Sequence, residues 1–519
     1  MEQNGMLGAR AQAYNEGETV YCESVGEYTL PDYMPEIRKL LRIETRLLPT
    51  GRFLSGGRAE ISGVCVHTVY YSDGEGHLSA AVESGDYRCA VPLAAEDAQV
   101  IPSCRVKGVT HRLGGPRRIG IRTAIEAQVA VLPREAIGEC EGCEGCETLH
   151  GREEVCERVF LSHDGVTLSD ISHVDGVMPS EVRPISTDAS VHVREVRLQE
   201  SGALCTGEVW VRVLYAVCTG GAGEEKSEMP DVLLRKIPFD LQVEGDGLSG
   251  FVPHGYCSSV DAAFEDDGLG GCELNVTVRL CMEGEGICTH EVAYLRDAYA
   301  RNARTDTVKK TLPVARYLGT VAQNISVSEK HPLDEVMPSA RAVTCALSVT
   351  ESECSCDDGK LRVLLTCKAE GILMQQGEGG MPHYERVEFA FPVRAQLPMT
   401  WQACEHAEYS VHAEYLGGTL RTDGESVRLD GELALCVCAL EKREIAYLER
   451  VMQTEDAMIR EPHTLTVAYP EDGETLWTLS KRYRADLERV AHQNGIDLRF
   501  LDEPDCRESI DGMASLLIS

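Results

Sequence analysis

The sequence predicts a mainly β protein: three antiparallel β-rich modules in tandem, followed by a small α+β unit of βααβ order. Ordered landmarks recur three times along the 519 residues. Runs such as VWVRVLYAV alternate apolar and polar side chains with a period of two, which is typical of a strand with one buried face. The chain is also too long for a single hydrophobic core. Together these observations favour several β domains.

A Met-Pro pair opens each of the three repeats, and two further landmarks follow it in the same order. Three ordered landmarks at near-constant spacing indicate internal repeats. We therefore expect the three Met-Pro prolines to occupy equivalent places. The landmarks are Pro35, Pro179 and Pro338 for the pair, Gly63, Gly207 and Thr366 for the residue 28 positions later, and Pro92, Pro238 and Pro392 for a second proline.

Composition between the repeats suggests the boundaries. A polar stretch rich in Gly, Glu and Cys is interpreted as a linker, and a locally basic stretch as a connector. The segment MPEIRKLLRIE is expected to be a helix, with Pro35 in its first turn, where a missing N–H has no cost. The predicted parts are a β module at 15–137, the linker at 138–154, a β module at 155–300, the connector at 301–316, a β module at 317–452 and the βααβ unit at 462–519.

Charge and leader patterns bear on partners and location. The formal net charge is −34, and a chain this acidic is repelled by nucleic acid and by anionic membranes. The N-terminal residues contain no apolar core of a secretory signal. We therefore expect a cytoplasmic protein whose 22 cysteines are unpaired.

No sequence motif of a nucleotide-binding loop, metalloprotease, serine hydrolase or kinase is present, so we expect a non-enzymatic protein without a cofactor. One candidate metal site remains, formed by Cys140, Cys143, Cys146 and Cys156. Thiolates at this spacing suit zinc or an iron–sulfur cluster. The glutamates between them would raise the thiol pKa values, which favours a solvated linker instead. A metal-linked regulator stays open as an alternative.

The C-terminal unit carries the densest motif. Thr475 is placed to cap a first helix, and Asn494-Gly495 to end a second one. The run Gly473–Trp477, together with Tyr483, Asn494 and the pair Asp511-Gly512, resembles a LysM domain. The resemblance implies a groove for N-acetylglucosamine polymers, lined by Gly473, Glu474, Thr475, Asn494, Gly495 and Ile496. We expect Ile496 to be exposed, and Trp477 to support the groove from below.

The repeats upstream, with LPDYMPEIRKLL in the first, resemble the SPOCS-type modules of clostridial spore-coat proteins. That resemblance implies a scaffold of spore envelope assembly at the mother-cell side of the forespore surface. It also implies that the LysM-like unit binds a coat-basement protein, a morphogenetic ATPase, rather than glycan. The loop predicted after Ile496 carries several acidic residues, which favours docking to a protein. A peptidoglycan-binding cell-wall protein is the alternative.

Overall fold

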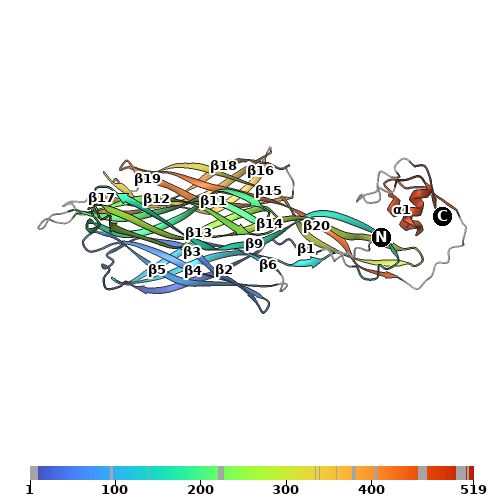
Figure 1. Cartoon of the computed structure of the whole chain (residues 1–519), viewed down its shortest axis with the longest axis horizontal. Helices are drawn as coiled ribbons and strands as arrows, with labels where there is room; N and C mark the ends of the chain where they lie inside the picture. Colours follow the sequence, from blue (N-terminus) through green and yellow to red (C-terminus); the bar gives the residue numbers. More distant parts are fainter. Residues whose placement is uncertain are drawn as a thin grey trace.

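A computed structural model describes residues 10–93, 98–137, 140–219, 227–333, 335–337, 339–357, 359–376, 382–402, 406–453, 465–497, 510 and 513–518. It is mainly β, with several small antiparallel sheets and two short helices near the C-terminus, which confirms the predicted class. Figure 1 shows a broad body of strands, a narrower stalk and the helical unit beyond it. Among the described residues, no helix is long and apolar enough to cross a membrane.

The first six long strands form two three-stranded sheets. Counted along the chain, the first, sixth and fifth of these strands make one sheet, in the spatial order β2-β7-β6. The second, third and fourth make the other sheet, in the order β3-β4-β5. Every pairing is antiparallel. We call these strands the first set: β2 (Glu18–Thr29), β3 (Lys39–Ser55), β4 (Arg58–Ser72), β5 (Leu78–Pro92), β6 (Gln99–Gly115) and β7 (Arg118–Leu132).

The same strand order occurs twice more, as β9-β14-β13 with β10-β11-β12 and as β15-β20-β19 with β16-β17-β18. The second set is β9 (Cys146–Val174), β10 (Val182–Gln199), β11 (Gly202–Thr219), β12 (Ser227–Glu244), β13 (Leu248–Asp266) and β14 (Cys272–Ala300). The third set is β15 (Thr305–Pro332), β16 (Arg341–Asp357), β17 (Lys360–Gln376), β18 (Pro382–Pro398), β19 (Ala407–Thr422) and β20 (Ser426–Gln453). Two short strands, β1 (Arg10–Gln12) and β8 (Arg134–Ala136), pair with one another, and Ala11 and the neighbouring Ile137 are buried against residues of the second and third sets.

Within each set the two sheets face one another across an apolar core, because alternate side chains of each strand point to the same side. In the second set, buried Val209, Val211 and Val213 of β11 lie in one core with Val276 and Val278 of β14. The third set has an equivalent core. The alternation in the sequence thus becomes a layered sandwich.

The Met-Pro landmark falls in the connection between strands one and two of every set. Pro35 lies between β2 and β3, and Pro179 between β9 and β10. Pro338 itself is outside the described residues, but Met337 and Ser339 lie between β15 and β16. Met337 is buried in the third core, which gives this connection a packing role.

The second landmark is explained by an aromatic ring. Gly63 is paired with Tyr87 and Gly207 with Phe239. A side chain at Gly63 would meet the Tyr87 ring at 2.4 Å, so glycine leaves room for it. In the third set the residue opposite the aromatic Phe391 is Cys367, not the predicted Thr366.

The second prolines are not equivalent. Pro238 directly precedes its aromatic residue, whereas Pro392 directly follows its own, and Pro92 ends β5. The feature that recurs is a small residue paired with an aromatic one, and the spacing of the prolines does not reveal it.

The predicted helix over MPEIRKLLRIE is wrong. Residues from Lys39 onward form β3, which is paired along its length with β4. The apolar residues there serve two different cores: Leu40 and Ile43 pack in the first set, whereas Leu41 is buried where the three sets meet. Tertiary contacts on both faces of the strand therefore override the helical spacing.

The stalk replaces the predicted linker and connector. Residues 146–154 belong to β9 and residues 305–316 to β15, so both predictions are wrong over those ranges. The pair β9/β14 continues to Cys146 opposite Ala300, well beyond the end of β13. The pair β15/β20 continues likewise to Thr305 opposite Gln453. These two ribbons form the stalk in Figure 1. Their polar composition reflects exposure to water, not a lack of structure.

The three sets meet at a junction built from equivalent positions. Leu41, Ile185 and Val343 each occupy the first register shift of strand two, and all three are buried in one cluster. β-Bulges of this kind redirect a side chain toward a neighbour. The register shift thus turns one apolar residue of each set toward the common junction.

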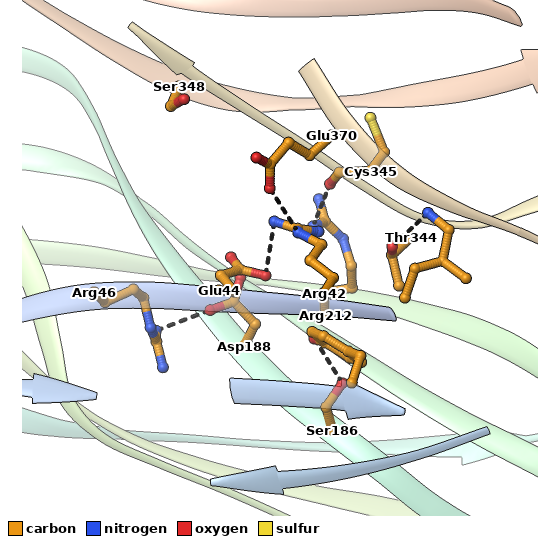
Figure 2. Close-up of polar contacts among 12 residues, drawn as sticks. Arg42, Glu44, Arg46, Ser186, Asp188, Arg212, Thr344, Cys345, Ser348 and Glu370 are labelled. Carbon is orange, nitrogen blue, oxygen red and sulfur yellow. Dashed lines mark hydrogen bonds and ion pairs between the residues drawn. The ribbon is translucent and has the colours of Figure 1, made fainter. Parts of the chain in front are cut away.

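Charged side chains of the three sets contact one another next to this junction, and Figure 2 shows these polar contacts. The guanidinium of Arg42 lies 3.2 Å from Glu370 of the third set and 3.1 Å from Glu44. Arg46 lies 2.8 Å from Asp188 of the second set. Only 4% of the Arg42 side chain is exposed, so its ion pairs are far better shielded from water than ordinary surface pairs.

One pair of cysteines departs from the prediction that all thiols are unpaired. Cys22 of β2 and Cys89 of β5 form a disulfide, with their Cα atoms 5.8 Å apart. The two strands are edges of facing sheets, which brings the Cα atoms into bridging range. The other 18 cysteines within the described ranges form no disulfide.

Candidate binding surface of the C-terminal unit

The unit has the predicted βααβ order. Strands β21 (Thr466–Ala468) and β22 (Leu516–Ile518) are antiparallel partners, and the helices α1 (Leu476–Tyr483) and α2 (Leu487–Gln493) lie between them in the chain. Its small core gathers Leu476, Leu479, Val490 and Leu516. The predicted turn at residues 511–512 and the acidic residues at 502, 503, 505 and 508 lie outside the described residues.

The loop before α1 is held by its own side chains. Thr475 is the N-cap, and its hydroxyl accepts a hydrogen bond from the backbone N–H of Thr478. The Glu474 carboxylate accepts from the backbone N–H of Glu471 and lies 3.0 Å from Arg482. Gly473 has φ +76° and open space around its Cα. Of the three predicted groove residues here, two have side chains engaged within the unit.

The loop after α2 is tied to the last strand. The side-chain amide of Asn494 donates to the carbonyls of Val490 and Leu517, and its oxygen accepts from the N–H of Leu517. Gly495 has φ +69°, which suits glycine. Ile496 is only 8% exposed and belongs to the core of the unit. The expectation of an exposed Ile496 is therefore wrong, because α2 ends by turning this side chain inward.

Replacing Asn494 with alanine should lower the stability of the unit by about 1–3 kcal/mol, since the carbonyl and N–H of Leu517 lose their partner. Hydrogen exchange of the α2 amides in the full chain would measure the loss. Glu488→Ala, at an exposed position of the same helix, is the control and should stay within about 0.5 kcal/mol of the unaltered protein. If the α2 amides are equally protected in both variants, Asn494 does not stabilise the unit by linking α2 to the last strand.

A second surface of the unit, which the sequence did not reveal, contacts the tip of the stalk. The indole N–H of Trp477 donates to Asp297 of β14 at 2.9 Å, and the Lys481 ammonium lies 2.6 Å from the same carboxylate. The Tyr299 hydroxyl donates to the Ala485 carbonyl at 2.7 Å. Its ring meets Trp477 edge to face at 5.0 Å between centroids. Trp477 therefore supports this contact, with only 4% of its surface exposed.

The cysteine motif lies nearby, and its four members are divided between two clusters. Cys140, Cys143 and Cys146 pack against Leu295 and neighbouring apolar residues of the stalk. Cys156 is buried in a different cluster. Burial, followed by the neighbouring Cys143, raises the pKa of Cys140 to about 11. Within the described ranges, no group of three or more His, Cys, Asp or Glu side chains is arranged to hold a metal ion.

A cavity of about 2000 Å³ is lined by residues of all three sets. His254 and Glu283 of the second set and His412 and Glu414 of the third set contribute to its wall. Burial raises the pKa of Glu283 to about 7 and that of Glu414 to about 8. Both signs of charge and apolar side chains line the cavity together, so its chemistry does not single out one class of ligand.

No family model, no curated protein and no solved structure matches the chain.

Proposed function

We propose that this protein is a non-enzymatic scaffold of spore envelope assembly, which docks a protein of the coat basement layer through its C-terminal unit. The LysM-like and SPOCS-like motifs of the sequence motivate the biological setting. The observation that supports a docking role is the architecture: a helical unit lies at the end of a stalk, beyond a body of three joined sandwiches.

The side chains of the predicted glycan groove support a protein partner over a sugar. Thr475 caps a helix, Asn494 is bound to the last strand, and Ile496 is buried. None of these three therefore presents a free side chain for hydrogen bonding or stacking with a sugar. The open backbone at Gly473 and Gly495 favours the second candidate, a peptidoglycan-binding cell-wall protein, since a sugar can approach backbone closely there.

The direct test compares the two ligands on the same preparation. The full chain and a chain ending at residue 453 are immobilised and offered the purified morphogenetic ATPase of the basement layer or soluble N-acetylglucosamine oligomers. We expect the full chain to retain the ATPase, the shortened chain to lose it, and the oligomers not to compete. Retention of the oligomers by the full chain, without binding of the ATPase, would instead establish the cell-wall function.

A further inference from the structure

The contact between α1 and the stalk has the composition of a recognition site. Asp297 and Tyr299 alternate along the end of β14, so their side chains share one face, and Arg301 follows directly after the last residue of the strand, Ala300. Each one binds a different feature of the helical unit. Asp297 binds Trp477 and Lys481, Tyr299 binds the carbonyl of Ala485 between α1 and α2, and Arg301 lies 2.5 Å from Asp486, the N-cap of α2.

The strand is shaped for this contact. The pairing of β14 with β9 shifts register between Leu295 and Asp297, immediately before the contact begins. Such a shift re-aims the side chains that follow it. Arg301 also lies 3.1 Å from Glu147 of β9, which orients the guanidinium toward the unit.

The interactions are directional as well as apolar. The Asp297 side chain is 15% exposed and accepts from both an indole N–H and an ammonium, so an apolar or basic residue in its place would leave those donors unpaired. The buried edge-to-face pair of Trp477 and Tyr299 supplies the apolar centre. A surface of this kind discriminates among strands by side-chain order.

We propose that the α1 face carrying Trp477 and Lys481 is a recognition surface for an extended strand with alternating acidic, aromatic and basic side chains, and that residues 297–301 occupy it in the resting chain. A partner protein that presents such a strand would bind by displacing the stalk tip. This inference rests on the proposed function, and it specifies the chemistry of the segment that the docked protein offers.

The chain length permits this exchange. Residues 454–464 join the end of β20 to the unit, and a segment of this length spans at most roughly 36–40 Å. The unit can therefore leave the tip and remain tethered.

The test uses a labelled hairpin peptide that carries residues 294–301 joined by Asn-Gly to residues 145–151, with serine at position 146. It is titrated with the unaltered full chain, with the Asp297→Lys/Tyr299→Ala chain, and with that chain carrying Lys481→Glu as well. We expect the opened chain to bind at least ten-fold more tightly than the unaltered one, and the added Lys481→Glu to abolish the gain. A peptide with Tyr299 replaced by serine is the control ligand.

A second probe covers the case in which the peptide does not form a hairpin. A full chain with Trp477→Ala and Lys481→Glu exposes an unaltered stalk tip, and should form a one-to-one complex with the opened chain in sedimentation experiments. If the opened chain neither binds the peptide more tightly than the unaltered chain nor forms this complex, the inference is overturned. So would small-angle scattering that shows the unit still docked in the opened chain. If the ATPase binds the full chain while both probes fail, the docking function stands and the partner uses another face.

Discussion

Replacing Arg42 with alanine is expected to cost about 3–5 kcal/mol of unfolding free energy, the range for breaking a buried ion pair. Arg42 belongs to the first set and Glu370 to the third, so the variant removes the ion-pair partner of Glu44 and one of three cations around Glu370, which keeps Lys368 and Arg386. Denaturant unfolding of the full chain measures the change. Arg46→Ala is the matched control, because its pair with Asp188 is about one-third exposed and should contribute less than about 1 kcal/mol.

The loss should depend on pH. Burial raises the pKa of Glu44, so the folded state binds its proton more tightly than the unfolded chain does. The penalty in the Arg42→Ala variant should therefore be complete at neutral pH, and shrink as the pH falls toward the ordinary carboxyl pKa of about 4.3. A loss of the same size at all pH values, or no loss at all, would show that Arg42 does not neutralise this junction.

Replacing Trp477 with alanine should destabilise the C-terminal unit by about 3–5 kcal/mol, the range for deleting a buried aromatic ring. The ring contributes to a core of few side chains, and it also contacts Tyr299 and Asp297 of the stalk. A unit this small has little stability to lose. We therefore expect both helices to exchange their amide hydrogens rapidly while the sandwich cores remain protected.

Trp477→Phe separates the two contributions of the indole. It keeps most of the apolar ring but removes the N–H that binds Asp297, and should cost about 1–2 kcal/mol. Protection of α1 and α2 that is unchanged in the alanine variant would contradict the central place of this side chain.

The junction and the stalk contact would have different roles in the proposed function. The three sets share buried residues at one junction, which joins them into one body. The stalk holds the helical unit at a distance from that body. In the proposed function, the body would be the structural part of the connection to the coat. The C-terminal unit would be the part that leaves the stalk and binds the partner protein.

The sequence by itself determined the features that depend on short-range pattern. Period-two alternation predicts strands because each strand has one face toward a core. The spacing of the Met-Pro pair marked the same connection in each set, as the positions of Pro35 and Pro179 show. Capping residues placed the two helices of the last unit, with Thr475 at the start of α1 and Asn494 at the end of α2.

Only the tertiary structure decided the features that join distant residues. Polar stretches at 146–154 and 305–316 become ribbon strands because their hydrogen-bond partners lie far along the chain. Cys22 reaches Cys89 because two sheet edges meet. Trp477 bonds to Asp297 across 180 residues. A single sequence encodes which side chains can make such contacts, but the folded backbone selects the pairs, since burial and direction arise only when the strands are assembled.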